Sequence, residues 1–219
     1  MDYSFLTKTM LFRGTSEDEA KSMLSCLETH EKQYKKGSII YHSGECIKNM
    51  GLVLSGGVNI VINDVWGNET ILSHVQAGQL FSEVYACIPN EPLLVNVIAS
   101  ENSSVLFLNA SKMLTTCQSV CPHHRRLIMN LLQISAAKNL SLSRHILHTS
   151  PKTIRGRLIS YLSEQSKRCG SYQFTIPFNR QELADYLGVD RSALSNELSK
   201  MQKDDILEFN KNRFTLKVT

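Results

Sequence analysis

The chain has 219 residues, of which 42% are hydrophobic and 20% are charged, a balance that is ordinary for a globular protein and excludes wholesale disorder. No stretch approaches the ~18 consecutive apolar residues of a transmembrane helix, and the first 14 residues lack the apolar core of a secretory signal. We therefore expect a cytoplasmic protein with no membrane partner. Six cysteines are too few for a disulfide scaffold, so free thiols are expected.

The formal net charge of +4 is distributed unevenly along the chain. Residues 1–121 carry 8 Lys/Arg and 12 Asp/Glu, whereas residues 122–219 carry 16 Lys/Arg and 8 Asp/Glu. A basic second half indicates that this part of the chain meets a polyanion such as a nucleic acid. The alternative is an uneven scatter of charges over solvated faces.

The pattern of the first half predicts a short helix followed by an antiparallel β domain. Ser16 and Glu19 form a capping-box pattern, which predicts a helix from Ser16 to about Glu28. Eight of the 11 glycines lie before residue 80 and separate short β-type runs. These runs are Ser38–Tyr41, Leu52–Leu54, Val58–Ile62, Thr70–Val75, Leu93–Ala99 and Val105–Leu108. Their spacing predicts a sandwich or barrel, with residues 63–68 as a polar hairpin tip.

A long amphipathic helix is predicted from Pro122 to His148, a stretch with no Gly and no further Pro. Its apolar residues form two neighbouring stripes at helical spacing, one of Leu127, Leu131 and Ile134, the other of Ile128, Leu132, Leu142 and Ile146. One small domain cannot cover so long an apolar face, so we expect a parallel helix from a second copy to pack on it. The candidate dimer residues are Leu127, Leu131, Ile134 and Leu142. A hairpin of helices within one chain is the alternative.

The segment from residue 178 to residue 198 predicts a helix-turn-helix, whose second helix enters the DNA major groove. Asn179 and Glu182 form a capping box, Gly188 suits a turn that needs positive φ, and Asp190 caps the second helix. Apolar residues at helical spacing are expected to pack the two helices together: Leu183, Leu187, Val189, Leu194 and Leu198. Glu197 does not fit, because such motifs usually turn an apolar side chain inward at this position.

The segments on either side of this motif complete a winged helix. Ser150 and Pro151 suit the N-cap and first position of a helix that ends near Cys169–Gly170. Behind the motif, Ile206–Phe209 and Arg213–Lys217 flank a polar turn, a pattern that predicts the two strands of a wing.

Three segments of the first half, Lys36–Glu45, Leu52–Val58 and Gly78–Glu83, precede the helix-turn-helix. In this order they resemble the Crp/Fnr family of bacterial transcription regulators over nearly the whole chain. The resemblance implies an α+β fold with an N-terminal antiparallel β-roll (a double-stranded β-helix or jelly roll), a long dimerisation helix and a C-terminal winged helix-turn-helix. The implied domains are residues 1–121 for effector sensing, 122–149 for dimerisation and a hinge, and 150–219 for DNA binding.

The function that this resemblance implies is sequence-specific DNA binding by a homodimer that regulates transcription. The implied partners are double-stranded DNA with an inverted repeat, RNA polymerase and an unidentified small-molecule effector. A different class of function is an effector-sensing module that controls a partner protein, and the basic second half argues against it. The sequence contains no nucleophile elbow, Walker loop or metalloprotease helix, so we expect neither an enzyme nor a cofactor.

The effector site departs from that of cyclic-AMP-binding relatives, in which a Glu meets the ribose and an Arg-Ser pair binds the phosphate. Gly78 and Glu83 match the ribose segment, with Ser82 in place of the family's second Gly. The Arg-Ser positions fall on Leu93 and Leu94, which offer a buried phosphate neither a cation nor a donor. We therefore expect no cyclic nucleotide. The candidate pocket residues are His74, Glu83, Val84, Leu93, Leu94, Asn96 and Asn139. The alternatives are a structural role for Glu83 and a filled roll without an effector.

The resemblance also assigns the DNA contacts. Three positions that read bases in the family match Arg191, Ser192 and Asn196, and Ser195 lies on the same expected face. Arg pairs with G and Asn with A, so the operator is expected to keep one G and to change at the Asn196 position. The candidate phosphate contacts are Arg180, Gln181, Lys211 and Arg213.

The cysteines carry one further motif. Cys117 and Cys121 are followed by Pro122, His123 and His124, and Cys and His at short spacing can bind Zn. No second cysteine pair accompanies them, so we interpret them as ordinary thiols and expect no metal site. Some relatives hold an iron–sulfur cluster with a cysteine cluster in an N-terminal extension. Such a cluster is not expected here, because Cys26 is the one cysteine before residue 45.

Overall fold

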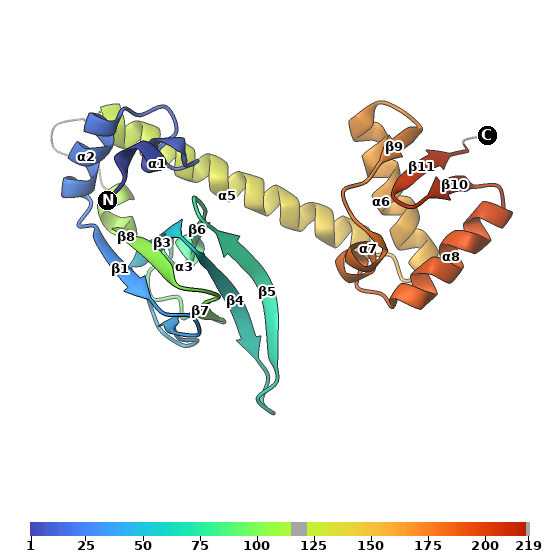
Figure 1. Cartoon of the computed structure of the whole chain (residues 1–219), viewed down its shortest axis with the longest axis horizontal. Helices are drawn as coiled ribbons and strands as arrows, with labels where there is room; N and C mark the ends of the chain where they lie inside the picture. The colour runs from blue at the N-terminus through green and yellow to red at the C-terminus, as the bar shows by residue number, and fades with distance from the viewer. Residues whose placement is uncertain (115–121, 218–219) are drawn as a thin grey trace. The chain divides into compact units, whose positions relative to one another are not determined.

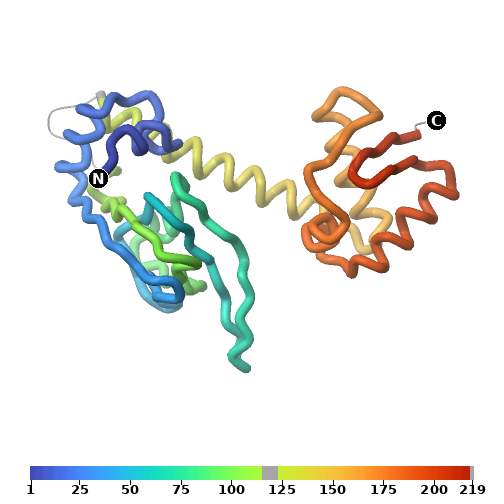
Figure 2. The backbone as a smooth tube through the Cα atoms, viewed as in Figure 1, coloured from blue at the N-terminus to red at the C-terminus, as the bar shows by residue number. Residues whose placement is uncertain are grey.

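The computed structural model describes residues 1–114 and 122–217. The chain forms two compact units, Met1–Ala136 and Ala137–Thr219, and the boundary between them falls inside one long helix. Figure 2 follows the backbone through each unit from the blue N-terminus to the red C-terminus. In the part of the chain that is described, no helix combines the length and the apolar character needed to span a membrane.

Two antiparallel sheets and four short helices make up most of the first unit (Figure 1). One sheet has the strand order β1-β8-β3-β6, with strands His30–Tyr34, Ser103–Asn109, Asn49–Ser55 and Leu80–Phe81. The other has the order β2-β7-β4-β5, with strands Ile39–Tyr41, Asn96–Ala99, Gly57–Asn63 and Glu69–Gln76. The short helices are α1 (Tyr3–Lys8), α2 (Glu17–Cys26), α3 (Glu83–Cys87) and α4 (Ala110–Leu114). The predicted antiparallel β domain is thereby confirmed.

The first sheet buries most of its strands β8 and β3, whereas its edge strand β1 is largely exposed. The outer face of the sheet packs under α1, α2 and the start of the long helix α5 (Pro122–Thr149) through a core of aliphatic side chains. Core residues from the sheet are Met50, Leu52, Leu80, Leu106 and Leu108. Asn130 of α5 adds polar contacts, since its Nδ2 donates to the carbonyls of Leu11 at 2.8 Å and Arg13 at 3.0 Å. The first turns of α5 are therefore an integral part of this unit.

Aromatic side chains occupy the space between the two sheets. The rings of Tyr41 and Phe81 pack edge to face with centroids 6.3 Å apart, and those of Tyr41 and Phe107 do so at 5.8 Å. Gly51 makes room for Phe81, because a Cβ at position 51 would lie 2.1 Å from the ring. Valines from both sheets complete this interior: Val53, Val58, Val75, Val97 and Val105. The interior of the roll is consequently filled by the chain's own apolar groups.

The predicted helix and strands of this unit are confirmed, with shifted ends. The capping box of Ser16 and Glu19 is present, and α2 begins at Glu17. The expected strand Leu93–Ala99 begins only at Asn96. Strand β1 was not predicted, because its residues His30–Tyr34 are polar and largely exposed. At the predicted hairpin tip, Asp64 accepts hydrogen bonds from residues 66 and 68, which lower the pKa of its carboxyl group.

The long helix extends to Thr149, one residue beyond the prediction. The following helix, α6 (Ile154–Cys169), begins three residues later than expected, and Ser150 is not its N-cap. The reason is that Ser150 still bonds to the last turn of α5, with its N and its Oγ both donating to the Ile146 carbonyl. Thr153 caps α6 instead, accepting from Gly156 N at 3.1 Å. The predicted end is confirmed, with Gly170 at φ 62°.

The second unit packs three helices against a small sheet. After α6 come β9 (Gln173–Thr175), α7 (Arg180–Leu187) and α8 (Arg191–Lys203), then β10 (Leu207–Asn210) and β11 (Arg213–Leu216). The sheet order is β10-β11-β9, and the hairpin of β10 and β11 turns at the predicted polar residues. The core is aliphatic and aromatic, including Leu158, Leu162, Leu183, Leu194, Leu198 and Phe214. The predicted winged helix-turn-helix is confirmed.

Cys26, Cys46, Cys87 and Cys169 are free thiols. Cys117 and Cys121 lie outside the described residues, so the interpretation of that motif stays a prediction. Among the residues that the structure does describe, no group of three or more His, Cys, Asp or Glu side chains is placed to hold a metal ion.

Candidate DNA-binding site

Both ends of helix α7 are fixed by residues on which its prediction was based. Asn179 Oδ1 accepts from Glu182 N at 3.0 Å, and Glu182 Oε2 accepts from Asn179 N at 2.7 Å. Gly188 adopts φ 62°, a left-handed conformation that costs other residues free energy, and closes the helix. These two devices fix where α7 starts and where the turn to α8 begins.

Helix α8 presents its first turn to solvent. Asp190 Oδ1 accepts from Ala193 N at 2.8 Å and from Ser192 Oγ at 2.5 Å, and these bonds hold the pKa of Asp190 below its usual range. Arg191 and Asn196 are exposed, as predicted for base readers. Ser192 is also exposed, but its hydroxyl already serves the cap. Ser195 is half-buried and donates to the Arg191 carbonyl at 3.0 Å.

Glu197 faces α6 through an ion pair instead of an apolar contact. Arg155 Nε lies 2.6 Å from Glu197 Oε1, and Arg155 Nη2 lies 2.7 Å from Asp204 Oδ2. Glu197 and Asp204 hold the pKa of Arg155 above its usual range. The carboxylate of Glu197, which does not fit the motif, is thus paired with Arg155, which lies 42 positions away in sequence. Sequence reasoning missed Arg155, because no local pattern links it to α8.

A second arginine of α6, Arg157, holds the turn of the motif. Its Nη1 donates to the carbonyls of Leu187 at 2.8 Å and Gly188 at 3.1 Å, and its Nε donates to the Pro151 carbonyl at 2.9 Å. These acceptors include the last carbonyls of α7, which have no partner inside the helix. Arg157 was also missed, for the same reason as Arg155.

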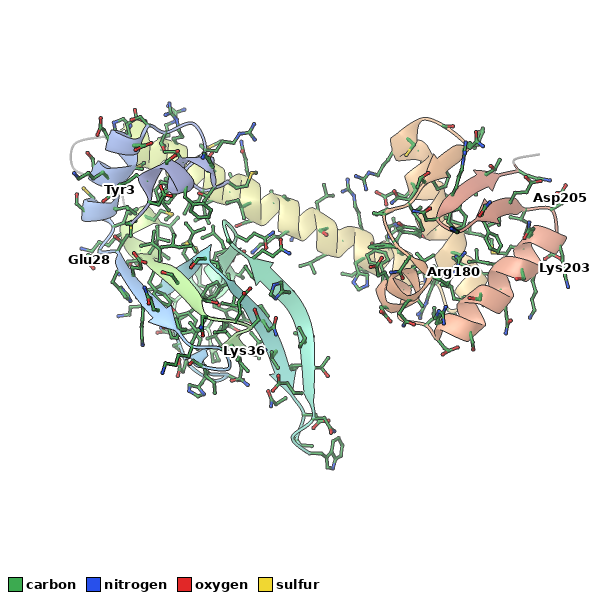
Figure 3. All side chains as sticks on the ribbon, viewed as in Figure 1. Tyr3, Glu28, Lys36, Arg180, Lys203 and Asp205 are labelled. Atoms are coloured by element: carbon green, nitrogen blue, oxygen red, sulfur yellow. The ribbon has the colours of Figure 1, made fainter. Side chains whose placement is uncertain are left out.

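Arg180 packs against the wing. Its guanidinium lies 5.0 Å from the ring centroid of Phe209 and 5.9 Å from that of Phe214, and its Nη2 donates to the Lys211 carbonyl at 3.1 Å. Burial lowers the pKa of Arg180, and the nearby charge of Arg191 lowers it further. Figure 3 labels Arg180 among the side chains of the second unit. The predicted phosphate contact is therefore also an anchor that joins α7 to the wing.

The other predicted phosphate contacts lie on the surface around Arg180. Lys211 and Arg213 are exposed at the wing turn, and Gln181 is exposed on α7 with its Nε2 donating to Asp185 Oδ1 at 2.8 Å. The wing turn and the start of α7 line an open hollow of about 580 Å³. Its lining residues are Pro177, Asn179, Arg180, Glu182, Lys211 and Asn212. This arrangement can hold an anionic group beside two cations.

The predicted effector residues of the first unit do not share one environment. Glu83 and Leu93 are buried, with 3% and 1% of their surface exposed, whereas Leu94 is 66% exposed. His74 and Val84 are exposed too, and His74 Nδ1 lies 2.8 Å from Asn59 Oδ1.

The two predicted asparagines also differ. Asn96 is committed to the fold, since its Oδ1 accepts from Ser43 N at 2.8 Å and its Nδ2 donates to Asn63 Oδ1 at 3.0 Å. Asn139 is exposed and belongs to the second unit. Whether these residues bind an effector stays a prediction.

The predicted dimer residues divide into two groups. Leu127 and Leu131 are buried in the core of the first unit, and Ile134 packs against that core. Leu142 is exposed, as are three other apolar residues in the same part of α5, Leu140, Ile146 and Leu147. A single chain therefore covers the start of the apolar face of α5 and leaves the later part uncovered.

Comparison with known families assigns both parts of the chain. Residues 31–120 match the cyclic nucleotide-binding domain, and residues 156–218 match the Crp-like helix-turn-helix domain. The chain belongs to the Crp/Fnr family. It is a transcription regulator with a DNA-binding helix-turn-helix and not an enzyme, as the sequence predicted.

Known Crp/Fnr relatives match along most of this chain. A probable transcriptional regulator flp of Lacticaseibacillus casei is 26% identical over 95% of this chain and 91% of its own length. Among solved structures, Thermus thermophilus catabolite activator protein is 21% identical over 95% of this chain and 94% of its own, with a TM-score of 0.52. CprK complexed with OCPA is 18% identical over 91% of this chain and 91% of its own, with a TM-score of 0.60. These structural similarities support the fold.

One departure from the Crp/Fnr pattern has a visible backbone consequence. Ser82, which replaces a family glycine, lies at φ 57° directly before the buried Glu83. This left-handed conformation is strained for a residue with a Cβ, and the Ser82 side chain makes no capping hydrogen bond to α3 in return. The strained backbone at Ser82 therefore has no compensating side-chain cap on α3.

Proposed function

We propose that this Crp/Fnr regulator binds an inverted repeat as a homodimer, with Arg191 and Asn196 reading bases in each half-site. The observation that carries the proposal is the position of these two side chains. Both are exposed on α8, a helix capped by Asp190 and held from behind by the pair of Arg155 and Glu197. A guanidinium suits the O6 and N7 acceptors of G, and a carboxamide suits A. Ser192 and Ser195 are weaker candidates, because their hydroxyls already have acceptors within α8 and its cap.

Phosphate contacts are proposed around the wing and the start of α7. Lys211, Arg213 and Gln181 are exposed there, and the nearby charge of Arg191 lowers the pKa of Arg180. An anion between such like charges relieves their repulsion. Such contacts position the protein on DNA but do not distinguish one base sequence from another.

Dimerisation is proposed through the uncovered part of α5. Leu132, Leu142 and Ile146 are 59%, 63% and 64% exposed, and they lie in one heptad-like stripe with Asn139. A polar Asn at one seam position fixes the register of paired helices at some cost in stability. This proposal keeps Leu142 and adds Leu132 and Ile146. Leu127, Leu131 and Ile134 support the seam from inside the first unit.

The effector is proposed to be something other than a cyclic nucleotide. Leu93 is buried and Leu94 points to solvent at the positions where cyclic-AMP-binding relatives hold the phosphate. Between the sheets, the rings of Tyr41, Phe81 and Phe107 pack on one another and offer a phosphate no cation. We expect no heat of binding in calorimetry with cyclic AMP or cyclic GMP at millimolar concentration. A binding isotherm with either nucleotide would contradict this part of the proposal.

A regulator of this kind acts where the bacterial chromosome and RNA polymerase are, so the proposal includes the cytoplasm and RNA polymerase as a further partner. This follows from DNA binding and from the family of the chain.

The proposal is tested by selecting bound sequences from a random duplex pool with the full chain. We expect an inverted repeat whose half-site centres lie about 10 bp apart, as two symmetric recognition helices require. Binding to that sequence should weaken steeply as salt rises, because phosphate contacts release counterions. Recovery of no consensus, or of a single asymmetric half-site, would contradict the proposal.

A further inference from the structure

His148, in the last turn of α5, is buried at the junction of three helices. Only 1% of its surface is exposed. Its ring packs edge to face on Tyr161 of α6 with centroids 5.3 Å apart, and it lies 5.8 Å from the ring of Tyr186 of α7. All of these residues belong to the second unit. The end of α5 therefore contacts α6 and α7 through a buried titratable side chain.

The polar contacts of His148 are specific. Its Nδ1 lies 2.9 Å from the Tyr186 hydroxyl, and its Nε2 lies 3.2 Å from Glu164 Oε2. The second distance suits an ion pair, but its direction is poor for a hydrogen bond, and Nε2 has no other hydrogen-bond partner among the described residues. Arg144 engages the other oxygen of Glu164 at 3.2 Å. Glu164 is thus already paired when His148 is neutral.

The tyrosine is held from a second direction by the same turn of α5. His145 Nε2 lies 2.8 Å from the Tyr186 carbonyl, and the two rings are 5.0 Å apart. Tyr186 belongs to α7, which packs directly on the base-reading helix α8. A shift of the end of α5 relative to Tyr186 must therefore move α7 or break these contacts.

Protonation of His148 would disturb this arrangement. Burial raises the pKa of Tyr186 and of Tyr161, so both hydroxyls stay protonated. The carboxylate of Glu164 beside Nε2 favours the tautomer with its proton on Nε2, and in that tautomer Nδ1 accepts from the Tyr186 hydroxyl. An imidazolium has no acceptor on Nδ1, so the Tyr186 hydroxyl would have to turn around.

The groups around His148 oppose its charge on balance. Burial, His145 and Arg144 lower the pKa of His148, whereas Glu164 raises it, and the net shift is downward. Because the folded pKa is lowered, the contribution of His148 to stability is present above about pH 6.5 and is lost as pH falls toward the lowered pKa.

We propose that neutral His148 is a positioning residue for DNA binding, which locks α7 onto the end of α5, and that its protonation releases this lock. The proposal rests on the DNA-binding function proposed above. Arg144, His145, Glu164, Tyr161 and Tyr186 are the titratable or charged groups that face it, and of these Glu164 alone favours the protonated form. Mild acid should therefore weaken operator binding through one residue that does not touch DNA.

The first test is the pH profile of operator binding by the full chain between pH 7.5 and 5.5. The dissociation constant of the unmodified chain should rise as pH falls through the lowered pKa of His148, by up to about tenfold at pH 5.5, which is about one unit below the ordinary histidine pKa. His148→Asn keeps an acceptor near the Nδ1 position but cannot be protonated, so its profile should be flat. His145→Gln removes the other histidine of residues 137–219. It should keep a pH dependence, with the midpoint moved upward because His145 lowers the pKa of His148. An unchanged profile in His148→Asn would overturn the proposal.

A second test does not depend on DNA. In the unmodified chain without DNA, the His148 ring resonances should titrate with a midpoint below 6.5, and the α7 amides should shift with the same midpoint. Tyr186→Phe removes the hydroxyl that favours the neutral ring and should raise that midpoint, whereas Tyr172→Phe, at an exposed position, should not. A His148 midpoint at or above 6.5 would overturn the proposal. Amides of α7 that do not shift with the His148 midpoint would also overturn it. If the chain binds no DNA at pH 7.5, the proposed function is wrong. The titration without DNA still tests whether neutral His148 holds α7 on the end of α5.

Discussion

The two units of this chain use different means to fix their parts. Between the sheets of the roll, Tyr41, Phe81 and Phe107 pack as apolar filling. In the second unit, directional polar contacts lie at the helix junctions, such as Arg155 to Glu197 and Arg157 to the carbonyl of Leu187. Apolar contact is not directional, whereas hydrogen bonds and ion pairs specify orientation. The roll is thus built as a filled scaffold, and the helix-turn-helix as a part whose orientation matters.

The largest loss of stability is expected from removing an aromatic ring from the interior of the roll. Phe81→Ala should lower the free energy of unfolding by about 3–5 kcal/mol, because it removes a buried aromatic ring and leaves a cavity. Urea denaturation of the full chain measures this. Leu94→Ala, at an exposed position in the same unit, should stay within about 0.5 kcal/mol. A loss below about 1 kcal/mol for Phe81→Ala would mean that the roll interior is not tightly filled.

The long helix belongs to both units, and its two ends should respond differently to charge. Leu142→Asp with Ile146→Asp should raise the dimer dissociation constant at least about 100-fold, because two carboxylates per chain would be buried in the seam. Leu131→Asp should instead unfold the first unit, where Leu131 is buried in a single chain. Sedimentation equilibrium together with circular dichroism separates the two effects. A stable dimer of the double variant would exclude this part of α5 as the seam.

Removing a helix cap in the second unit should lower the free energy of unfolding by a smaller amount. Asn179→Ala should cost about 1 kcal/mol, since it removes the acceptor for Glu182 N, whereas Asn179→Gly should cost only a few tenths. Thermal unfolding measured at one pH checks both. Gln202→Ala, at an exposed position of α8, is the control and should change little. Equal losses for Asn179→Ala and Gln202→Ala would show that the cap does not matter.

The smallest expected effect lies where the first unit departs from its family. Ser82→Gly should stabilise the chain by about 0.5–1 kcal/mol, because glycine adopts φ 57° without steric strain. Ser82→Ala should stay within about 0.5 kcal/mol of the unmodified chain, since alanine has the same strained backbone. Paired urea curves of the two variants decide. Destabilisation by Ser82→Gly would mean that the Ser82 side chain makes a contribution larger than the strain.

These regions also differ in how far the sequence predicted them. The helix-turn-helix depends on contacts three residues apart, such as Asn179 with Glu182, and such contacts can be recognised in a short window. The partner of Glu197 could not be recognised, because Arg155 lies 42 residues away. The same limit explains β1, whose polar residues pair with β8 across the sheet. The late start of α6 has a local cause, because Ser150 bonds back to Ile146 instead of capping the helix that follows.

Within the first unit, sequence reasoning identified the right segments but not their shared environment. The candidate pocket residues include the buried Leu93, the exposed Leu94 and the structural Asn96. Which side of a strand or loop each faces depends on the packing of two sheets, and no local pattern determines it. The filling by Phe81 depends on the absence of a side chain at Gly51, a contact between strands.

Base reading by Arg191 is tested most directly by competition binding with single-base operator variants. Arg191→Ala should weaken operator binding by about 1–3 kcal/mol and remove the preference for G at one position of each half-site. Arg180→Ala, which loses the wing anchor and the proposed phosphate contact, should weaken binding to all variants alike. If Arg191→Ala leaves every base preference intact, Arg191 does not read DNA and the proposed recognition is wrong.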